Sequence, residues 1–286
     1  MKKIRFFNFK DNDLIEIVNK NHDYSNSSVV GNLYIINNFL MIPLEKSRTI
    51  RVWVPSTYHL NNIRYPVIYM HDGQNLFDKT TSFLGVEWEV DESIETMIND
   101  DILSGFIVVG IDNGPDRMIE YLPNWDNQNG EGALYGQFIV KTLKPFIDEH
   151  FRTLKNKENT LIGGSSMGGL ISFDIGLRYP DIFGYIMAMS TSFQIPEKGK
   201  REKFLNSITL SNETRLYLDS GYPKDNSEFI EPVRLELLER GFNQNNLFTK
   251  ITPGHTHRES DWATRFKDAI IWLYNSKIEE HNALLL

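Results

Sequence analysis

Residues 161–170, LIGGSSMGGL, predict a short buried strand, a glycine-rich turn and the first turn of a helix that continues through Arg178. The turn fits G-x-S-x-G with Ser166 at its centre, whereas Ser165 has Met167 two positions on. Flanking glycines leave room for a serine held in strained backbone on a sharp strand-to-helix turn. The following helix aims its first N–H groups at that serine and would stabilise negative charge there. Serine and glycine also crowd into ordinary turns, so Ser166 is a candidate nucleophile only if its surroundings agree.

Composition sets broad limits on what the chain does. With 286 residues and 41% hydrophobic content it can bury a large core, and we expect a single α/β domain over residues 1–286. A net charge of −8 disfavours nucleic acid or an anionic membrane surface as the main partner. The sequence has no cysteine, which excludes disulfides, thiolate nucleophiles and Cys-based zinc sites. No signal-type or spanning apolar run is visible, so we expect a cytoplasmic protein.

The order of strands and helices predicts an α/β architecture. From Pro66 onward apolar runs alternate with helical segments, which is typical of a mostly parallel sheet flanked by helices. Two N-terminal antiparallel strands are expected to precede it, and residues 1–30 are expected to form an edge strand or irregular arm. The expected strands lie at 33–43, 48–55, 66–70, 106–111, 161–165, 183–190, 215–219 and 247–251, and the expected helices at 90–99, 138–150, 171–178, 227–240 and 260–274. Residues 191–212 give no clear pattern.

Two further residues could activate the serine. A serine needs a base to take its proton, and the base needs an acid to orient it. In α/β-hydrolases the chain order is serine, acid, histidine. Ser166, Asp225 and His257 follow successive strands in that order, so all three would lie at one edge of the sheet. Asp219 and Glu228 are alternative acids, although the first ends a strand and the second is expected on a helix surface.

The choice of histidine has alternatives as well. His255 and His257 are two residues apart, a spacing that could bind zinc, but no nearby carboxylate or cysteine cluster completes such a site. His71 lies near the predicted pocket, yet it precedes the serine and breaks the order. We take His257 as the base.

Catalysis of this kind also needs an oxyanion hole. One backbone N–H should come from Met167, directly after the serine, and another from the loop after an earlier strand. Gln74 is the candidate for the second, because it follows the strand ending at His71-Asp72-Gly73.

Several side chains are candidates for binding a substrate. The polar loop at residues 71–78 and the long aromatic-rich segment at 113–136 both follow buried strands, where open α/β sheets bind ligands. Their aromatic residues could hold a sugar or phenolic ring, or could pack onto the core. The candidates are Asp72, Trp88, Arg117, Tyr121 and Trp125.

Four stretches together resemble the Putative esterase family of the α/β-hydrolase superfamily, which includes enterochelin esterases, feruloyl esterases and acetyl-xylan esterases. They are 64–78, 110–121, 163–184 and 257–262, and the resemblance extends from Arg48 to Tyr274. A Glu and a Trp follow His257 at the family's offsets, which favours His257 over His255. The turn before Asp225 departs from the family pattern, with Lys224 where an acid is usual. The first 30 residues have no counterpart and are too short for the N-terminal β-domain of some siderophore esterases.

The resemblance implies a serine carboxylic-ester hydrolase with no metal or organic cofactor. Its substrate would be a small-molecule ester of a sugar, a phenolic acid or another small alcohol. Acyl transfer on the same residues, or a binding module that kept the fold without activity, are the alternatives. The sequence leaves the oligomeric state open, a homo-oligomer included.

Overall fold

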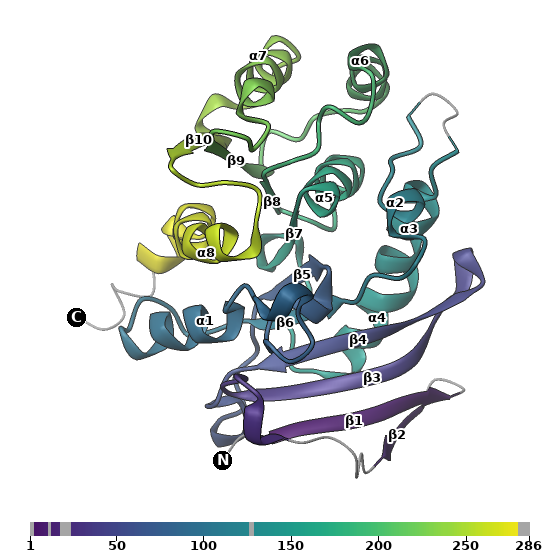
Figure 1. Ribbon diagram of the computed structural model, residues 1–286, viewed down its shortest axis with the longest axis vertical. Helices are drawn as coiled ribbons and strands as arrows, with labels where there is room; N and C mark the ends of the chain where they lie inside the picture. The colour runs from purple at the N-terminus through teal and green to yellow at the C-terminus, as the bar shows by residue number, and fades with distance from the viewer. Residues whose placement is uncertain (1–2, 11–12, 18–23, 126–128, 280–286) are drawn as a thin grey trace.

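A computed structural model describes residues 3–10, 13–17, 24–125 and 129–279 (Figure 1). Within these ranges ten strands form one mixed sheet, in the order β10-β9-β8-β7-β5-β6-β4-β3-β1-β2. The strands are β1 (Lys3–Lys10), β2 (Asp13–Ile17), β3 (Asn32–Met41), β4 (Lys46–Val54), β5 (Val67–His71), β6 (Ile107–Ile111), β7 (Thr160–Ser165), β8 (Tyr185–Met189), β9 (Arg215–Tyr222) and β10 (Leu247–Pro253). The helices are α1 (Val90–Asn99), α2 (Arg117–Glu120), α3 (Gly132–Phe138), α4 (Lys144–His150), α5 (Met167–Arg178), α6 (Lys198–Ser207), α7 (Ile230–Glu239) and α8 (Glu259–Leu273).

The centre of the sheet is parallel and buried on both faces. The pairs β10–β9, β9–β8, β8–β7, β7–β5 and β5–β6 are all parallel. Every residue of β5, β6, β7 and β8 is buried, as expected for apolar runs covered on both sides. Parallel pairing places the carboxyl ends of these strands at one edge, so the loops that follow them meet there. The α/β-hydrolase architecture predicted from the sequence is confirmed.

The N-terminal strands extend this sheet on one side. β4 pairs antiparallel with β3, as the sequence predicted, and also pairs antiparallel with β6. β1 then pairs parallel with β3, and β2 closes this edge antiparallel to β1. The segment expected to form an N-terminal edge strand or irregular arm therefore contains a pair of strands. Residues 1–2, 11–12 and 18–23 lie outside the described part of the chain.

Helices cover both faces of the sheet (Figure 1). On one face α1 and α8 pack against Ile68 and Val108 of the central strands, through apolar side chains such as Ile94 and Phe266. On the other face α3 to α7 pack around a core that includes Ile162. No helix in the described ranges is long and apolar enough to cross a membrane.

Two segments differ from the sequence-based expectation. The predicted helix at 138–150 is α3, a π-helical turn at Ile139–Leu143 and then α4. The unassigned segment 191–212 contains α6, whose sequence KGKREKFLNS is strongly polar. Phe204 and Leu205 are its buried apolar residues, and a buried ion pair from Arg201 to Glu236 of α7 adds to its attachment at 2.7 Å. Such a helix depends on distant contacts, so its own periodicity was too weak to reveal it.

Candidate active site

Ser166 occupies a sharp turn between β7 and α5. Its backbone has φ 57° and ψ −124°, a strained conformation for a residue with a side chain. The glycines of the motif make this turn sterically feasible: a Cβ on Gly164 would lie 3.0 Å from the carbonyl carbon of Gly168. A larger side chain at position 164 would therefore crowd the backbone of the turn, which is why a glycine is needed there.

The Ser166 hydroxyl lies beside the end of β8. Its Oγ is 3.2 Å from Ser192 Oγ, and the Ser166 N–H donates to the carbonyl of Met189 at 3.0 Å. Within the described residues, the hydrogen-bond partner of Ser166 Oγ is Ser192 rather than His257. Sequence reasoning missed Ser192, because nothing in a polar segment signals contact with a residue 26 positions earlier.

The structure brings Asp225 and His257 together as the sequence predicted. His257 Nδ1 donates to Asp225 Oδ1 at 2.6 Å, with Asp225 buried and the His257 side chain 32% exposed. Burial alone would raise the pKa of the Asp225 carboxyl, but hydrogen bonds from His257, Ser190 and the Gly221 N–H outweigh it and hold that pKa below its usual value. An ionised Asp225 therefore faces the imidazole at neutral pH. No described contact joins His257 to Asp219 or Glu228, the alternative acids.

Behind Asp225 lies a buried network that the sequence did not reveal. Ser190 Oγ donates to Asp225 Oδ2 at 2.5 Å and itself accepts from Trp262 Nε1 and Arg265 Nη2, both at 2.8 Å. Arg265 also lies 3.5 Å from Asp219 Oδ2 and from Asp225 Oδ2. Trp262 and Arg265 are three residues apart on α8, so both lie on the helix face toward the sheet. This network fixes one carboxylate oxygen of Asp225 and leaves the other for His257.

A cavity of about 440 Å³ opens over these residues. It is lined by Ser166 and His257 together with His71, Asp72, Gln74, Asn75, Phe83, Trp88, Asn113, Arg117, Ser165, Glu259 and Trp262. The wall combines aromatic rings with amide and charged groups, which suits a small ligand with a ring and several polar atoms.

The two residues predicted to supply oxyanion N–H groups flank the turn. Met167 is the first residue of α5, and the first N–H groups of a helix have no acceptor within the helix. Gln74 lines the cavity, and its side-chain Oε1 accepts from the Asn113 N–H at 3.1 Å. This contact holds the loop of Gln74 against the loop after β6.

Of the predicted binding residues, Asp72, Arg117 and Trp88 line the cavity. Asp72 is engaged already: Arg117 donates to both of its oxygens at 2.7 and 2.8 Å, and Asn113 donates to Oδ1 at 2.7 Å. The Arg117 charge is thus paired with Asp72. Arg117 therefore lines the cavity as one partner of an ion pair.

Tyr121 and Trp125 are core residues and do not line this cavity. Tyr121 is fully buried, and its hydroxyl accepts from the Asp72 N–H at 3.2 Å. Trp125 donates from Nε1 to Asp174 at 2.6 Å and stacks on Phe204 with ring centroids 5.0 Å apart. The aromatic-rich segment therefore packs inward here, and the prediction that these two residues bind substrate is corrected.

His71 lies beneath the nucleophile turn in a neutral state. Burial lowers its pKa to about 3, so the ring carries no charge at neutral pH. Its Nδ1 lies 3.0 Å from the Tyr135 hydroxyl, whereas Nε2 has no hydrogen-bond partner among the described residues. His71 is thus placed as part of the cavity floor, in agreement with the choice of His257 as the base.

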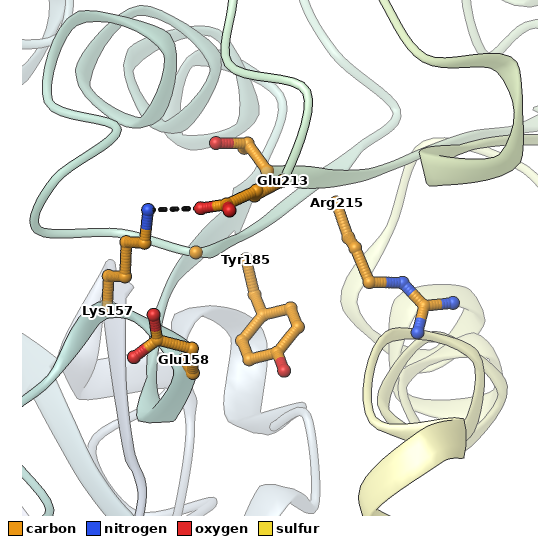
Figure 2. Close-up of a pocket in the computed structure, with 7 residues that line it drawn as sticks. Lys157, Glu158, Tyr185, Glu213 and Arg215 are labelled. Carbon is orange, nitrogen blue, oxygen red and sulfur yellow. Dashed lines mark hydrogen bonds and ion pairs between the residues drawn. The ribbon is translucent and has the colours of Figure 1, made fainter.

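A second cavity, of about 190 Å³, lies at the opposite edge of the sheet, where β8 and β9 begin (Figure 2). Lys157 and Glu213 form an ion pair of 2.5 Å, which is drawn in Figure 2. Glu158 and Arg215 also line this cavity, and Arg215 points away from the ion pair. Its charges balance, and its lining residues include no histidine that could activate a hydroxyl. The cavity over Ser166 is therefore the candidate active site.

Comparisons with known proteins identify the family of this chain. The model of the family described as Putative esterase matches residues 43–273. An uncharacterized Bacillus subtilis protein, YbbA, is 24% identical over 245 residues, which cover 80% of this chain and 93% of that protein. An endo-1,4-beta-xylanase/feruloyl esterase of Xylanibacter ruminicola is 28% identical over 224 residues, covering 76% of this chain but only 28% of that protein.

A solved structure shows the same fold. The enterobactin esterase FES of Shigella flexneri superimposes with a TM-score of 0.71 at 17% identity. The match covers 88% of this chain and 61% of that one. This chain thus corresponds to part of two longer esterases.

Proposed function

This chain belongs to the Putative esterase family and is a carboxylic-ester hydrolase, and we propose that it cleaves its ester with Ser166, His257 and Asp225. The observation that carries the proposal is the 2.6 Å hydrogen bond from His257 to a buried, ionised Asp225, with His257 and Ser166 in the wall of one cavity. Membership of an esterase family favours a catalytic role over a module that only binds.

In the proposed reaction Asp225 stays ionised and accepts a hydrogen bond from the Nδ1–H of His257, so the unprotonated Nε2 is free to act as the base. Ser166 Oγ turns from Ser192 toward Nε2, loses its proton and attacks the ester carbonyl. The N–H groups of Met167 and Gln74 hold the negative oxygen of the tetrahedral intermediate. Collapse of that intermediate breaks the ester bond, and His257 gives its proton to the departing alcohol. Water then attacks the acyl-enzyme by the same steps and releases the acid.

For the substrate we propose an ester that carries a phenolic or sugar ring. Trp88 and Trp262 line the cavity with ring centroids 5.5 Å apart, and Phe83, 63% exposed, stands at its rim. Amide groups of Gln74 and Asn113 line it as well and could meet ring hydroxyls. An ester library that varies the acid and the alcohol separately would identify the preferred class. Equal rates on aliphatic and aromatic esters would overturn the proposed substrate class.

The Ser166→Ala variant tests the catalytic assignment. It should lower turnover of a p-nitrophenyl ester by at least about 10³-fold and abolish labelling by a fluorophosphonate, with an unchanged melting temperature. Ser165→Ala is the matched control on the neighbouring serine, and it should cost less than about tenfold. Retained turnover in Ser166→Ala, or loss of labelling in Ser165→Ala alone, would contradict the assignment.

A further inference from the structure

Outside the active site, three carboxylates meet near the start of α1. Glu87, Asp91 and Glu92 each place a carboxylate oxygen within 4.8 Å of one from each of the others. Asp91 is fully buried, Glu87 is 7% exposed and Glu92 is half-buried. Carboxylates are rarely buried this close together without a positive partner, because both desolvation and mutual repulsion oppose it.

In both Glu87 and Asp91, one carboxylate oxygen accepts a hydrogen bond and the other does not. Glu87 Oε1 accepts from the Ser28 hydroxyl, and Asp91 Oδ2 accepts from the Val30 N–H at 2.8 Å. The second oxygen of each, Glu87 Oε2 and Asp91 Oδ1, is buried and has no hydrogen-bond partner among the described residues, and the same holds for Glu92 Oε2. Buried carboxylate oxygens almost always have a donor, so these three need a positive partner, either a bound cation or protons shared between neighbours such as Asp91 and Glu92.

The surrounding charge strengthens this conclusion. Asp78 and Glu89 are close enough to add to the negative potential at Glu87. In the described part of the chain, no lysine or arginine forms an ion pair with any of the three cluster residues.

We propose that Glu87, Asp91 and Glu92 bind a calcium ion. Calcium takes carboxylate oxygens at about 2.3–2.6 Å, so oxygens on opposite sides of one ion lie up to about 5 Å apart, which accommodates the separation found here. Remaining positions would be filled by water or backbone carbonyls, as is usual for this ion. The role would be structural, since none of the three residues lines the cavity over Ser166 and the proposed ester chemistry needs no metal.

The site would stiffen one wall of the active cavity. Trp88 follows Glu87 directly, lines the cavity and donates its backbone N–H to the Asn75 carbonyl at 2.9 Å. A bound ion would link this segment to α1 and, through Ser28 and Val30, to the chain before β3. Calcium would therefore act on the enzyme mainly through stability and through the position of the Trp88 wall.

Calcium titration of the full-length chain tests the proposal directly. After treatment with a chelator, isothermal titration calorimetry with CaCl₂ should show one site per chain, with a Kd of about 10⁻⁶–10⁻³ M. The melting temperature should rise by about 5 °C or more once free calcium exceeds the Kd by about 100-fold. These readouts do not depend on esterase activity, so they can fail without affecting the proposed function. Absence of both binding and stabilisation would overturn the proposal.

Two variants locate the site. Asp91→Asn removes one charge from the cluster and should weaken calcium binding by at least about tenfold. Glu89→Gln removes the same charge from an exposed neighbour outside the cluster and should change the Kd by less than about threefold. If the cluster instead holds shared protons, Asp91→Asn should raise the melting temperature and calcium should have no effect on the wild-type protein, which would refute the site.

Discussion

The Asp225→Asn substitution is the sharpest test of the proposed chemistry, because the structure dictates how the new amide must lie. Oδ2 of Asp225 accepts from Ser190 Oγ and the Gly221 N–H, and Arg265 lies 3.5 Å away. All of these groups face it as donors, so an asparagine must keep its amide oxygen on that side. Its NH₂ group then points at His257 Nδ1 in place of Oδ1.

That orientation forces the wrong tautomer on the histidine. Facing a donor, His257 Nδ1 must accept, so Nε2 carries the proton and cannot take one from Ser166. We expect kcat/KM for a p-nitrophenyl ester to fall by about 10³–10⁴, which corresponds to about 4–5.5 kcal/mol of transition-state stabilisation. The change is nearly isosteric, so circular dichroism should show an intact fold.

The matched control is Asp219→Asn, which alters the other carboxylate beside Arg265. Asp219 lies 3.5 Å from Arg265 and has no described contact with His257, so its loss should reduce kcat/KM by less than about tenfold. Stopped-flow or steady-state assays at pH 8 measure both variants. If Asp225→Asn keeps activity within tenfold of the wild type, or if Asp219→Asn is the more damaging change, the assignment of the acid is wrong.

Three further outcomes follow from other contacts. Because burial holds the pKa of His71 at about 3 against about 6.5 in the unfolded chain, its contribution to stability is complete above pH 6.5 and decreases as the pH falls toward 3. Between pH 7 and pH 5 the wild-type free energy of unfolding should therefore fall by about 2 kcal/mol more than that of His71→Gln, measured by urea titration. Trp125→Phe loses a buried 2.6 Å hydrogen bond and should cost about 1–3 kcal/mol of stability, while kcat/KM should stay within about twofold. A large loss of activity without a loss of stability would show instead that Trp125 binds substrate. In Gly73→Ala the new Cβ would lie 2.6 Å from the carbonyl carbon of Gly110, so the loop that carries the second oxyanion N–H must move. The value of kcat/KM should then fall by about 10–10³-fold. In the control Gly199→Ala the new Cβ meets no atom within 4 Å, so the kinetics should be unchanged.

The sequence was sufficient for the parts of the molecule that depend on local pattern and chain order. The apolar runs of β5 and β6 are buried on both faces, and such runs are typical of central parallel strands. Parallel order then places the loops after β7, β9 and β10 at one edge. The contact between Asp225 and His257 could be predicted for that reason, although the residues are 32 positions apart.

Features that depend on long-range packing could not be predicted. Trp125 and Trp88 look alike in the sequence, yet one stacks in the core on Phe204 and the other lines the cavity. The support of Asp225 by Ser190 and Arg265 arises only when α8 packs against the ends of β8 and β9. The hydrophobic periodicity of a segment carries no information on which distant segment it will contact, so these contacts are seen only in the folded structure.

The pairing of Trp88 with Trp262 has an optical consequence. The two indoles lie 5.5 Å apart in the cavity wall, and Trp262 also meets the His257 ring edge-on at 5.1 Å. Indole fluorescence responds to nearby charge and to displacement of water, so the emission of this pair should change when a ligand fills the cavity. The chain has five tryptophans, and Trp53 and Trp125 are shielded from ligand by the core. Occupancy of the cavity could thus be followed by intrinsic emission, without any attached dye.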